Sequence, residues 1–477
     1  MSVSYFFSRV NQITTNLLKN RLFLLFILCM IIYNINFHPI PNYDTVTARV
    51  LPWGIFETHS FNLDAFVDTP SFKMQTKYID NYGHYLTVSP ITLPVLITPF
   101  YVIPYIFVKI MNIPISLNNS TFVLISLITE KIVASILTSC SVVILYLVLQ
   151  RLILDKYALW SSVLYAFATS TWVISSQALW QHSMAELLLC LILLILLWII
   201  DAESLTGYAL LGVTSALFVM NRQADAIFLI PVFYFVLINK PIIKCIVYVV
   251  GLGLAAAPFI LYNVTYFGSI FGGYMVNAAV LQITPSILVA LVGYTISPNR
   301  GLFFFSPILI FSLVGIWVIL KNKVSLNPVI RTLLLLFALC IPINLLIYCS
   351  FPVWWGGESF GYRYLVDSLP LLTVFLGCAI EYLWSKKPSL SASVKVIFAI
   401  FVLWSVLVQV CGAFYYYYDW DIKNSQHESV NTDPSRVWNI LDLQIFYGVS
   451  LDPNPYSLLL HKIKVNRSSS FNLTQSQ

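Results

Sequence analysis

Charged side chains are scarce in this chain of 477 residues, because Asp, Glu, Lys and Arg together make up only 10% of it. Soluble proteins carry about a quarter of charged residues, so an ordinary water-soluble enzyme is excluded. Apolar residues make up 59%, and the mean hydropathy is +0.82. The net charge of +6 is small and spread thinly along the chain. We therefore expect a lipid bilayer as the partner of this chain and no nucleic acid.

Cysteine pairs and nucleotide-binding motifs are missing as well. The eight cysteines lie singly in or beside apolar segments, without CxxC spacing, which is typical of small core residues. Neither a GxGxxG nor a P-loop pattern is present, which predicts that no nucleotide is bound. No further metal ligands lie near His182 in the sequence. We expect that no cofactor or metal is required, and a divalent metal stays an open alternative.

Long apolar runs recur along the chain, and a membrane-spanning helix needs about 20 such residues. The sequence predicts an all-α polytopic membrane protein with about eleven transmembrane helices, in which a large first loop lies outside. The expected spans lie near residues 21–38, 121–149, 157–177, 183–200, 207–221, 223–239, 244–262, 302–320, 331–350, 366–384 and 393–415.

Basic residues set the expected orientation. Short connections carry Arg151 with Lys156 and Lys321 with Lys323, and such loops belong in the cytoplasm. The N-terminus, residues 1–20, joins them there. The transmembrane domain then covers 21–418, the first outer loop covers 39–120, and a tail of 419–477 is extracytoplasmic. We expect a multi-pass protein of the plasma (inner) membrane.

The stretch 86–111 is expected to differ from a simple span. Its prolines recur every four or five residues, and each removes a backbone donor. We expect a broken segment at the outer interface, with a kinked span as the alternative. Glu130 and Lys131 fall within the next apolar run. A charge at mid-bilayer costs about 2.5–3.5 kcal/mol, so we expect both residues at the outer edge.

Asp44 follows the first apolar run closely, so its carboxylate is held near the membrane surface. It is a candidate general base that takes a proton from an acceptor hydroxyl. The alternative is a helix cap or a solvated loop residue. The other acids of this loop lie farther from the membrane exit.

A polar set opens a later span with Gln181, His182 and Glu186. His182 and Glu186 are four residues apart and share a helix face. We expect all three in a substrate pocket, with Glu186 holding one tautomer of His182.

Two arginines stand between apolar runs. Arg222 either neutralises Asp225, three residues on, or faces a phosphate while Asp225 orients it. Arg300, in Ser297-Pro298-Asn299-Arg300-Gly301, is either a membrane-interface residue or a second phosphate contact.

The strongest segment runs from Trp354 to Asp367 between two long apolar runs. Its paired glycines permit sharp turns, and its aromatic rings offer flat faces for sugars. Arg363 presents a planar fork suited to phosphate. We expect Arg363 to bind the donor phosphate. The other pocket residues expected from this segment are Trp354, Trp355, Glu358 and Tyr362.

Taken in order, these segments resemble a known family. The order runs from the Asp44 loop through Ser89-Pro90, Ser176-Gln177-Ala178-Leu179-Trp180-Gln181-His182, Asn299-Arg300-Gly301 and Trp354-Trp355-Gly356-Gly357 to Gly361-Tyr362-Arg363-Tyr364. This set is similar to bacterial members of the membrane glycosyltransferases related to protein O-mannosyltransferases and lipid A aminoarabinose transferases. The chain departs from those mannosyltransferases in lacking paired acids, since Tyr43 and Thr45 flank Asp44.

The resemblance implies a GT-C fold, a polyprenyl-phosphate-linked sugar as donor and an acid of the first outer loop as catalytic base. Asp44 matches that acid. The expected function is sugar transfer to an acceptor hydroxyl of a glycan, lipid or protein at the extracytoplasmic face. The alternative is a transporter or flippase of a lipid-linked or amphipathic solute. A transporter is expected to place its charges near the midplane and to contain internal repeats.

Overall fold

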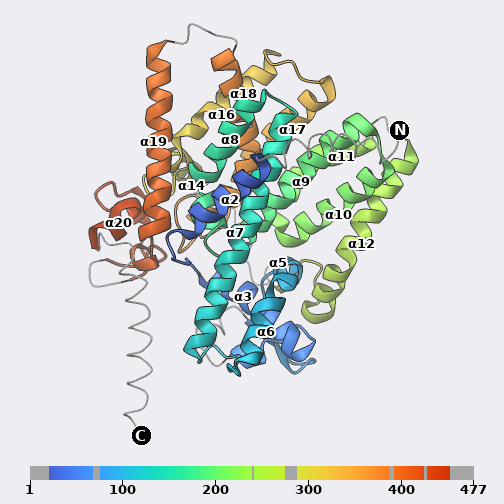
Figure 1. Cartoon of the computed structure of the whole chain (residues 1–477), viewed down its shortest axis with the longest axis vertical. Coiled ribbons are helices and arrows are strands. Elements are labelled where there is room, and N and C mark those ends of the chain that lie inside the picture. Colours follow the sequence, from blue (N-terminus) through green and yellow to red (C-terminus); the bar gives the residue numbers. More distant parts are fainter. Residues whose placement is uncertain are drawn as a thin grey trace.

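The computed structural model describes residues 21–67, 76–238, 241–273, 287–385, 391–423 and 427–451. The expected cytoplasmic segment 1–20 lies outside these ranges, as does the tail beyond 451. Almost all of the regular structure is helical (Figure 1). The exception within the described ranges is one antiparallel pair of strands, in which Thr76 faces Thr87.

The elements follow one another along the chain with short connections. In order they are α2 (Arg21–Asn34), α3 (Tyr43–Thr58), η1 (Asp64–Phe66), β1 (Thr76–Ile79), β2 (His84–Thr87), α5 (Thr92–Ile97), η2 (Thr98–Tyr101), α6 (Val102–Ile110), α7 (Ser120–Gln150), α8 (Asp155–Phe167), the π-helical turn η3 (Thr171–Ser175), α9 (Gln181–Ala202), α10 (Leu205–Asn221), η4 (Gln223–Leu229), α11 (Ile230–Leu237), α12 (Ile242–Phe267), α14 (Ile287–Ile296), α15 (Leu302–Phe305), η5 (Pro307–Leu309), α16 (Ile310–Leu320), α17 (Pro328–Cys349), η6 (Arg363–Ser368), α18 (Leu369–Ser385), α19 (Ala392–Tyr415), η7 (Tyr418–Trp420), η8 (Pro434–Trp438) and α20 (Gln444–Leu451).

The protein is a mostly helical, multi-pass membrane protein. Within the described ranges, seven helical segments are long and apolar enough to cross a bilayer: Thr92–Ile110, Ser120–Gln150, Gln181–Ala202, Ile242–Phe267, Pro328–Cys349, Arg363–Ser385 and Ala392–Tyr415. Six of them coincide with expected spans. The other five expected spans correspond to shorter helices, such as α2 and α10. The total of eleven spans stays a prediction.

The connections expected to share one side do meet at one end of the bundle. Arg21, at the start of α2, forms an ion pair with Asp155, at the start of α8. Arg151, after α7, pairs with Asp201 near the end of α9. The charged ends of four helices therefore lie together. That this end faces the cytoplasm stays a prediction.

The first loop forms a layer at the other end, where α3 and α6 lie in Figure 1. The proline-rich stretch is helical from Thr92 to Ile110 but is interrupted by η2, which starts next to Pro99. Lys109 of α6 forms an ion pair of 2.7 Å with Glu57 of α3. The interruption agrees with the predicted broken segment, and the length of 19 residues also fits the kinked span.

Glu130 and Lys131 correct an expectation, because both are buried inside the protein rather than placed at an exposed edge. Glu130 accepts a hydrogen bond from Arg49 of α3 at 3.3 Å. Lys131 donates to the Asn36 side chain at 2.8 Å and to the His38 carbonyl at 2.9 Å. A buried charge is tolerated where such partners replace water. The folded first loop supplies these partners, which the apolar run alone does not reveal.

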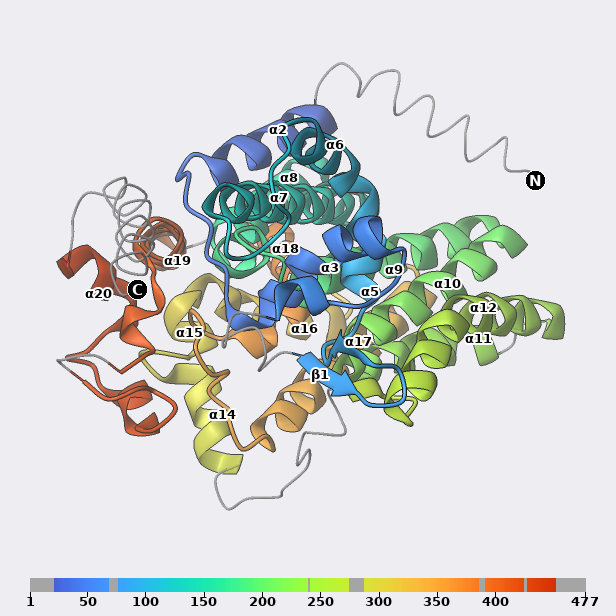
Figure 2. The same ribbon diagram turned by 90° about the horizontal axis from the view of Figure 1, so that it is seen from below.

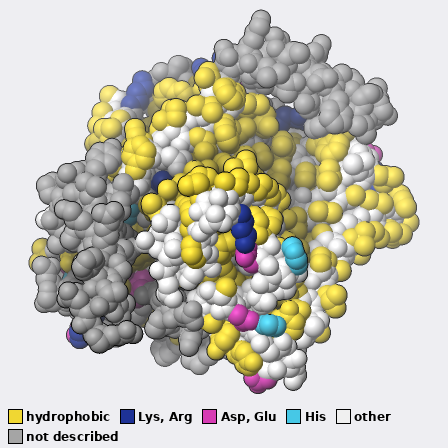
Figure 3. All heavy atoms as spheres, turned by 60° about the horizontal axis from the view of Figure 1, so that its bottom comes forward, with side chains coloured by type: hydrophobic (Ala, Val, Ile, Leu, Met, Phe, Trp, Pro, Cys, Tyr) yellow, Lys and Arg dark blue, Asp and Glu magenta, His cyan; other side chains and the backbone are white. Residues whose placement is uncertain are grey.

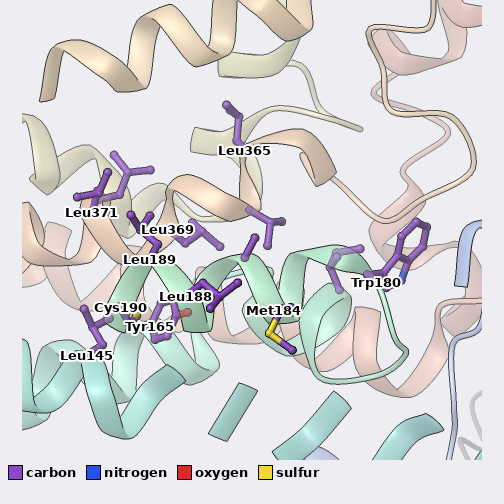
Figure 4. Close-up of a cluster of buried hydrophobic side chains, with 14 of the residues drawn as sticks. Leu145, Tyr165, Trp180, Met184, Leu188, Leu189, Cys190, Leu365, Leu369 and Leu371 are labelled. Carbon is purple, nitrogen blue, oxygen red and sulfur yellow. The ribbon is translucent and has the colours of Figure 1, made fainter. Parts of the chain in front are cut away.

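The core lies between tightly packed helices. A Cβ atom on Gly315 of α16 would meet the Phe375 carbonyl oxygen of α18 at 1.8 Å, so glycine allows these two helices to touch. Leucines of α9 and α18 interdigitate beside them, and Trp180 lies at one end of this cluster (Figure 4). Six cysteines are buried and two are half-buried, and all eight are free, which confirms them as core residues.

The described part of the tail packs onto the helices. Helix α20 lies beside α19 in both ribbon views (Figures 1 and 2). Trp420, Asp421 and Gln444 are fully or almost fully buried. Residues 419–451 therefore contribute to the same folded body as the helices, although they lie beyond the expected boundary at 418.

Candidate functional site

A cavity of about 190 Å³ lies where the first loop meets the helix ends. Five elements or their flanks supply its polar wall: α3, α9, η4, α17 and η6. Of the expected site residues, it brings together Asp44, Gln181, His182, Arg222 and Arg363. The remaining lining residues are Ser89, Pro90, Trp180, Gln223, Ala224, Phe271, Ile347, Tyr348, Phe351 and Tyr364. Side chains from widely separated parts of the sequence thus face one space.

Asp44 and Arg363 form an ion pair across this cavity. Arg363 Nη1 lies 2.8 Å from Asp44 Oδ2, although 319 residues separate them. The Arg363 side chain is 10% exposed and the Asp44 side chain is 44% exposed. A ligand in the cavity therefore meets a carboxylate and a guanidinium side by side.

The start of α3 explains why Asp44 lies there. Asn42 caps α3, since its side chain accepts the backbone N–H of Asp44 at 3.4 Å and Thr45 completes a capping box. The Asn42 amide also donates to the Glu358 carbonyl oxygen at 2.5 Å. One residue thus ends the entry loop, starts the helix and fastens it to the loop that carries Arg363.

Arg363 is held by aromatic rings as well as by charge. Its guanidinium carbon lies 4.7 Å from the centre of the Trp180 ring and 5.0 Å from that of Tyr364. Such contacts orient a planar cation. The preceding backbone turns at Gly356 and Gly361, whose φ angles are +81° and +60°. The predicted use of glycine for sharp turns in this segment is confirmed.

Arg222 contacts two buried carboxylates. Its Nε lies 3.2 Å from Asp225 and 2.7 Å from Asp367. Its Nη2 donates to the Tyr348 hydroxyl at 2.5 Å, and that hydroxyl lies 3.3 Å from Asp225. The predicted pairing of Arg222 with Asp225 is therefore confirmed. The role of Arg222 toward a phosphate stays a prediction.

The partner of His182 differs from the one expected. His182 Nδ1 lies 2.8 Å from Asp367 of η6. Glu186 instead accepts a hydrogen bond from Thr171 at 2.6 Å and does not line the cavity. The shared helix face was right, but η6 packs against the start of α9 and supplies a carboxylate. The tautomer role of Glu186 and its place in the pocket are wrong.

Four residues of the strongest segment also lie outside the cavity lining. Trp354 packs edge-on against Tyr294, with ring centres 5.9 Å apart. Trp355 Nε1 donates to Asn431 at 3.0 Å. The Tyr362 hydroxyl accepts from the Ser170 backbone N–H at 3.1 Å. These aromatic residues fix the loop that carries Arg363, so their expected role in the pocket wall is corrected.

Glu358, also expected in the pocket, joins the first loop to the tail. Its carboxylate accepts from the Asn431 amide at 3.2 Å, and its carbonyl accepts from Asn42. Burial raises the pKa of Glu358, and the nearby negative charges of Asp421 and Asp44 raise it further. This carboxylate therefore senses the charge of both neighbouring regions.

Arg300 is the clearest correction. It is fully buried, and it does not line the cavity. Its donors reach the carbonyls of Asn299, Trp355 and Gly357, together with the side chains of Asp421 and Gln444. A guanidinium has five N–H donors, and these five contacts occupy them. Arg300 therefore clamps the loop to the tail and leaves no donor for a phosphate.

Sequence reasoning missed three residues of the site. Asp367 closed the strongest segment, and a lone acid at the entrance of an apolar run was a usable signal. Tyr364 neighbours Arg363 and carried a similar signal. Tyr348 lies at the end of an apolar helix, where an aromatic residue looks like an ordinary membrane-interface residue.

Comparison with known proteins does not extend these observations, since no protein-family model and no curated protein matches the chain. Among the described residues, no group of three or more His, Cys, Asp or Glu side chains is arranged to hold a metal ion. Whether a metal is needed stays a prediction. The geometry that a function has to explain is a carboxylate beside two arginines in one cavity of mixed polarity.

Proposed function

We propose that this protein is a membrane glycosyltransferase that moves a sugar from a polyprenyl-phosphate-linked donor to an acceptor hydroxyl. The observation that carries the proposal is the Asp44–Arg363 pair, 2.8 Å apart in a cavity that Arg222 also lines. A general base and a phosphate-binding cation have to meet one substrate at neighbouring atoms. This pair offers both groups within reach of one ligand.

In the proposed reaction, the acceptor oxygen attacks the anomeric carbon in line with the departing phosphate. Asp44 takes the proton of the acceptor hydroxyl. The bond between the anomeric carbon and the phosphate oxygen breaks, and its electron pair leaves with the lipid phosphate. Arg363, helped by Arg222, neutralises the added negative charge. The sugar is transferred with inversion of configuration at its anomeric carbon.

The proposed donor requires the binding of Arg363 to change. Before the donor binds, Arg363 contacts the Asp44 carboxylate. A phosphate that takes over this guanidinium releases Asp44, which then accepts a proton from the acceptor hydroxyl. Asp44 is half-exposed, so its carboxylate changes partners at a smaller desolvation cost than a fully buried one. Donor binding thus prepares the base.

The apolar part of the cavity suits a lipid carrier. Ile347, Phe351 and Phe271 lie on its wall beside the charged residues. The side chains of α12 include several exposed apolar residues, among them Leu254 and Leu261. The polar groups on the face in Figure 3 are likewise scattered among hydrophobic ones. We propose that the lipid stays in the bilayer while its phosphate and sugar enter the cavity.

The proposed location follows from the same arrangement. The cavity lies at the end of the bundle opposite the charged connections of Arg21 and Arg151. We propose that this end is extracytoplasmic in the plasma membrane, with the N-terminus in the cytoplasm. The acceptor is then a glycan, lipid or protein of the cell envelope. We propose no cofactor for the reaction.

The test uses Asp44→Asn, with Asp80→Asn as the matched control. Asp80 lies in the exposed turn between β1 and β2 of the same loop and outside the cavity. The purified full chain in lipid nanodiscs is given polyprenyl-phosphate-linked mannose, glucose or aminoarabinose, together with envelope extracts as acceptor. Mass spectrometry then follows the sugar. Asp44→Asn should abolish transfer while Asp80→Asn retains it.

Transfer by Asp44→Asn at the wild-type rate would overturn the mechanism. A transporter gives a different outcome, in which the sugar crosses the bilayer but stays bound to its lipid phosphate. Mass analysis of outer-surface glycans from cells with and without the protein identifies the acceptor. Unchanged glycans and glycoproteins in such cells would contradict the proposed function.

A further inference from the structure

Asp367 is a fully buried carboxylate that joins two cavity residues and has no role in the transfer step proposed above. It lies 2.8 Å from His182 Nδ1 and 2.7 Å from Arg222 Nε. Its side chain is 0% exposed, so a ligand in the cavity meets it only through these partners. Burying an acid is costly unless such contacts compensate it. The arrangement therefore fixes His182 and Arg222 relative to each other.

The contact with Asp367 determines which nitrogen of His182 is protonated. A carboxylate accepts hydrogen bonds, so Nδ1 carries the proton in this contact. The ring lines the cavity, so Nε2 is the nitrogen left for a ligand. Arg222 and Arg363 line the same cavity, and their charges disfavour a second proton on the ring. The neutral ring then presents a lone pair at Nε2.

A lone pair selects its ligand. An ionised phosphate oxygen only accepts hydrogen bonds, so it repels a neutral Nε2 and binds the arginines instead. A hydroxyl group donates its proton to Nε2. A sugar linked to phosphate carries both chemistries a few bonds apart. The cavity matches this combination, with guanidinium groups and one proton acceptor on its wall.

We propose that His182 Nε2 accepts a hydrogen bond from a hydroxyl of the bound sugar, and that Asp367 is the positioning residue that keeps His182 in the required tautomer. This inference rests on the proposed function, because it assumes a phosphate-linked sugar as ligand. It adds a residue that recognises the sugar itself. Donors without a hydroxyl at the contacted position should bind less tightly.

The tautomer is tested by ¹⁵N NMR of histidine-labelled full-length protein in lipid nanodiscs. The signal of His182 is identified by its loss in His182→Phe. We expect a neutral ring protonated at Nδ1 in the wild type, and a shift toward Nε2 protonation in Asp367→Asn. His84, which pairs with Asp64 outside the cavity, is the matched control and should be unchanged. A wild-type ring protonated at Nε2 or at both nitrogens would overturn the proposal.

The ligand is tested by adding two sets of lipids to the same samples. One is polyprenyl phosphate without sugar, and the other is polyprenyl phosphate linked to mannose, glucose or aminoarabinose. Native mass spectrometry records which lipids bind. We expect a sugar-linked lipid to move the His182 signal and polyprenyl phosphate to leave it in place.

The outcomes separate this inference from the proposed function. If no lipid of either set binds, the proposed function fails. If sugar-linked lipids bind and the His182 signal does not move, the contact proposed here is wrong while the function stands. An equal shift with polyprenyl phosphate alone would assign His182 to the phosphate and also overturn the contact.

Discussion

Arg363 and Arg300 hold the same loop at two places, yet their surroundings are opposite. Arg363 makes its ion pair with a half-exposed carboxylate and lies on the wall of the cavity. Arg300 is 0% exposed and gives its donors to five acceptors of the protein. Both arginines stand in polar segments next to apolar runs. The number of occupied donors, rather than the sequence context, separates the binding arginine from the structural one.

The two regions also depend on each other. Arg300 holds the carbonyls of Trp355 and Gly357. The chain then turns at Gly361, where a Cβ atom would meet the Phe305 ring at 2.7 Å. It reaches the cavity at Arg363. The clamp around Arg300 thus builds the backbone on which the cavity residue stands, and changes in the two regions should have separable effects on stability and on activity.

The largest effect is expected for Arg300→Ala. The change leaves Asp421 buried without its cation, and removal of one partner of a buried pair costs about 3–5 kcal/mol. Thermal unfolding in nanodiscs should show a large fall in the midpoint temperature. Lys77→Ala, in the exposed strand β1, is the control and should unfold like the wild type. An unchanged midpoint for Arg300→Ala would contradict the clamp.

Arg363→Ala should show the opposite pattern. Its partner Asp44 is 44% exposed, so the loss of stability should stay within about 1 kcal/mol. Loss of a group that stabilises developing charge lowers the rate by about 10²–10³-fold. Transfer assays and donor binding by native mass spectrometry measure the change. Arg363→Lys should recover part of the activity, because it restores charge without the planar fork. Unchanged donor affinity in Arg363→Ala would remove its assigned role.

A smaller effect is expected for Tyr348→Phe. The hydroxyl of Tyr348 lies between Arg222 and Asp225, at 2.5 and 3.3 Å. Its removal should cost about 1 kcal/mol, measured as a several-fold weaker donor affinity. Tyr382→Phe provides a control, since Tyr382 packs on Trp317 away from the cavity. Equal donor affinities in Tyr348→Phe and the wild type would show that Arg222 does not need this hydroxyl.

The smallest effect concerns pH and Glu358, which lies between the two regions. Burial raises its pKa in the folded protein. The folded state therefore binds more protons than the unfolded state between the ordinary and the raised pKa, and stability falls as pH rises through that window. Glu358→Gln removes this dependence. The variant should unfold like the wild type below the ordinary glutamate pKa and at a slightly higher temperature above it.

The measurement is a series of unfolding midpoints from acidic to neutral pH. Glu428→Gln, at an exposed site of the tail, is the control. A midpoint difference between Glu358→Gln and the wild type that stays constant over this range would contradict the raised pKa. Transfer should stay close to that of the wild type, because Glu358 does not line the cavity.

Much of the fold followed from hydrophobic patterning. The apolar runs that became α7, α9 and α17 are long and bounded by polar residues, so their helices could be predicted. The placement of Glu130 could not, because the first loop supplies its partner Arg49 from 81 residues away. A membrane scale treats lipid as the surroundings of a helix and does not include the folded loop beside it.

The site divides in the same way. Asp44 and Arg363 stood out because each is a charged residue in a polar segment at a predicted membrane boundary. The wrong partner for His182 arose because helical spacing identifies a shared face within one helix but not the element that packs against it. Asp367 comes from η6, 185 residues away. The role of Arg300 depended on a tail whose folding against the helices left no periodic signal.

The clamp around Arg300 gives chain order a consequence for biosynthesis. Asp44 and Arg300 leave the ribosome well before Asp421 and Gln444, so early helices enter the bilayer while two acceptors of Arg300 do not yet exist. We expect the Arg363 loop to settle only when synthesis passes Gln444. A chain that stops earlier would be inserted but would expose an uncompensated cation, a feature that cellular quality-control proteases can recognise before any lipid carrier is engaged.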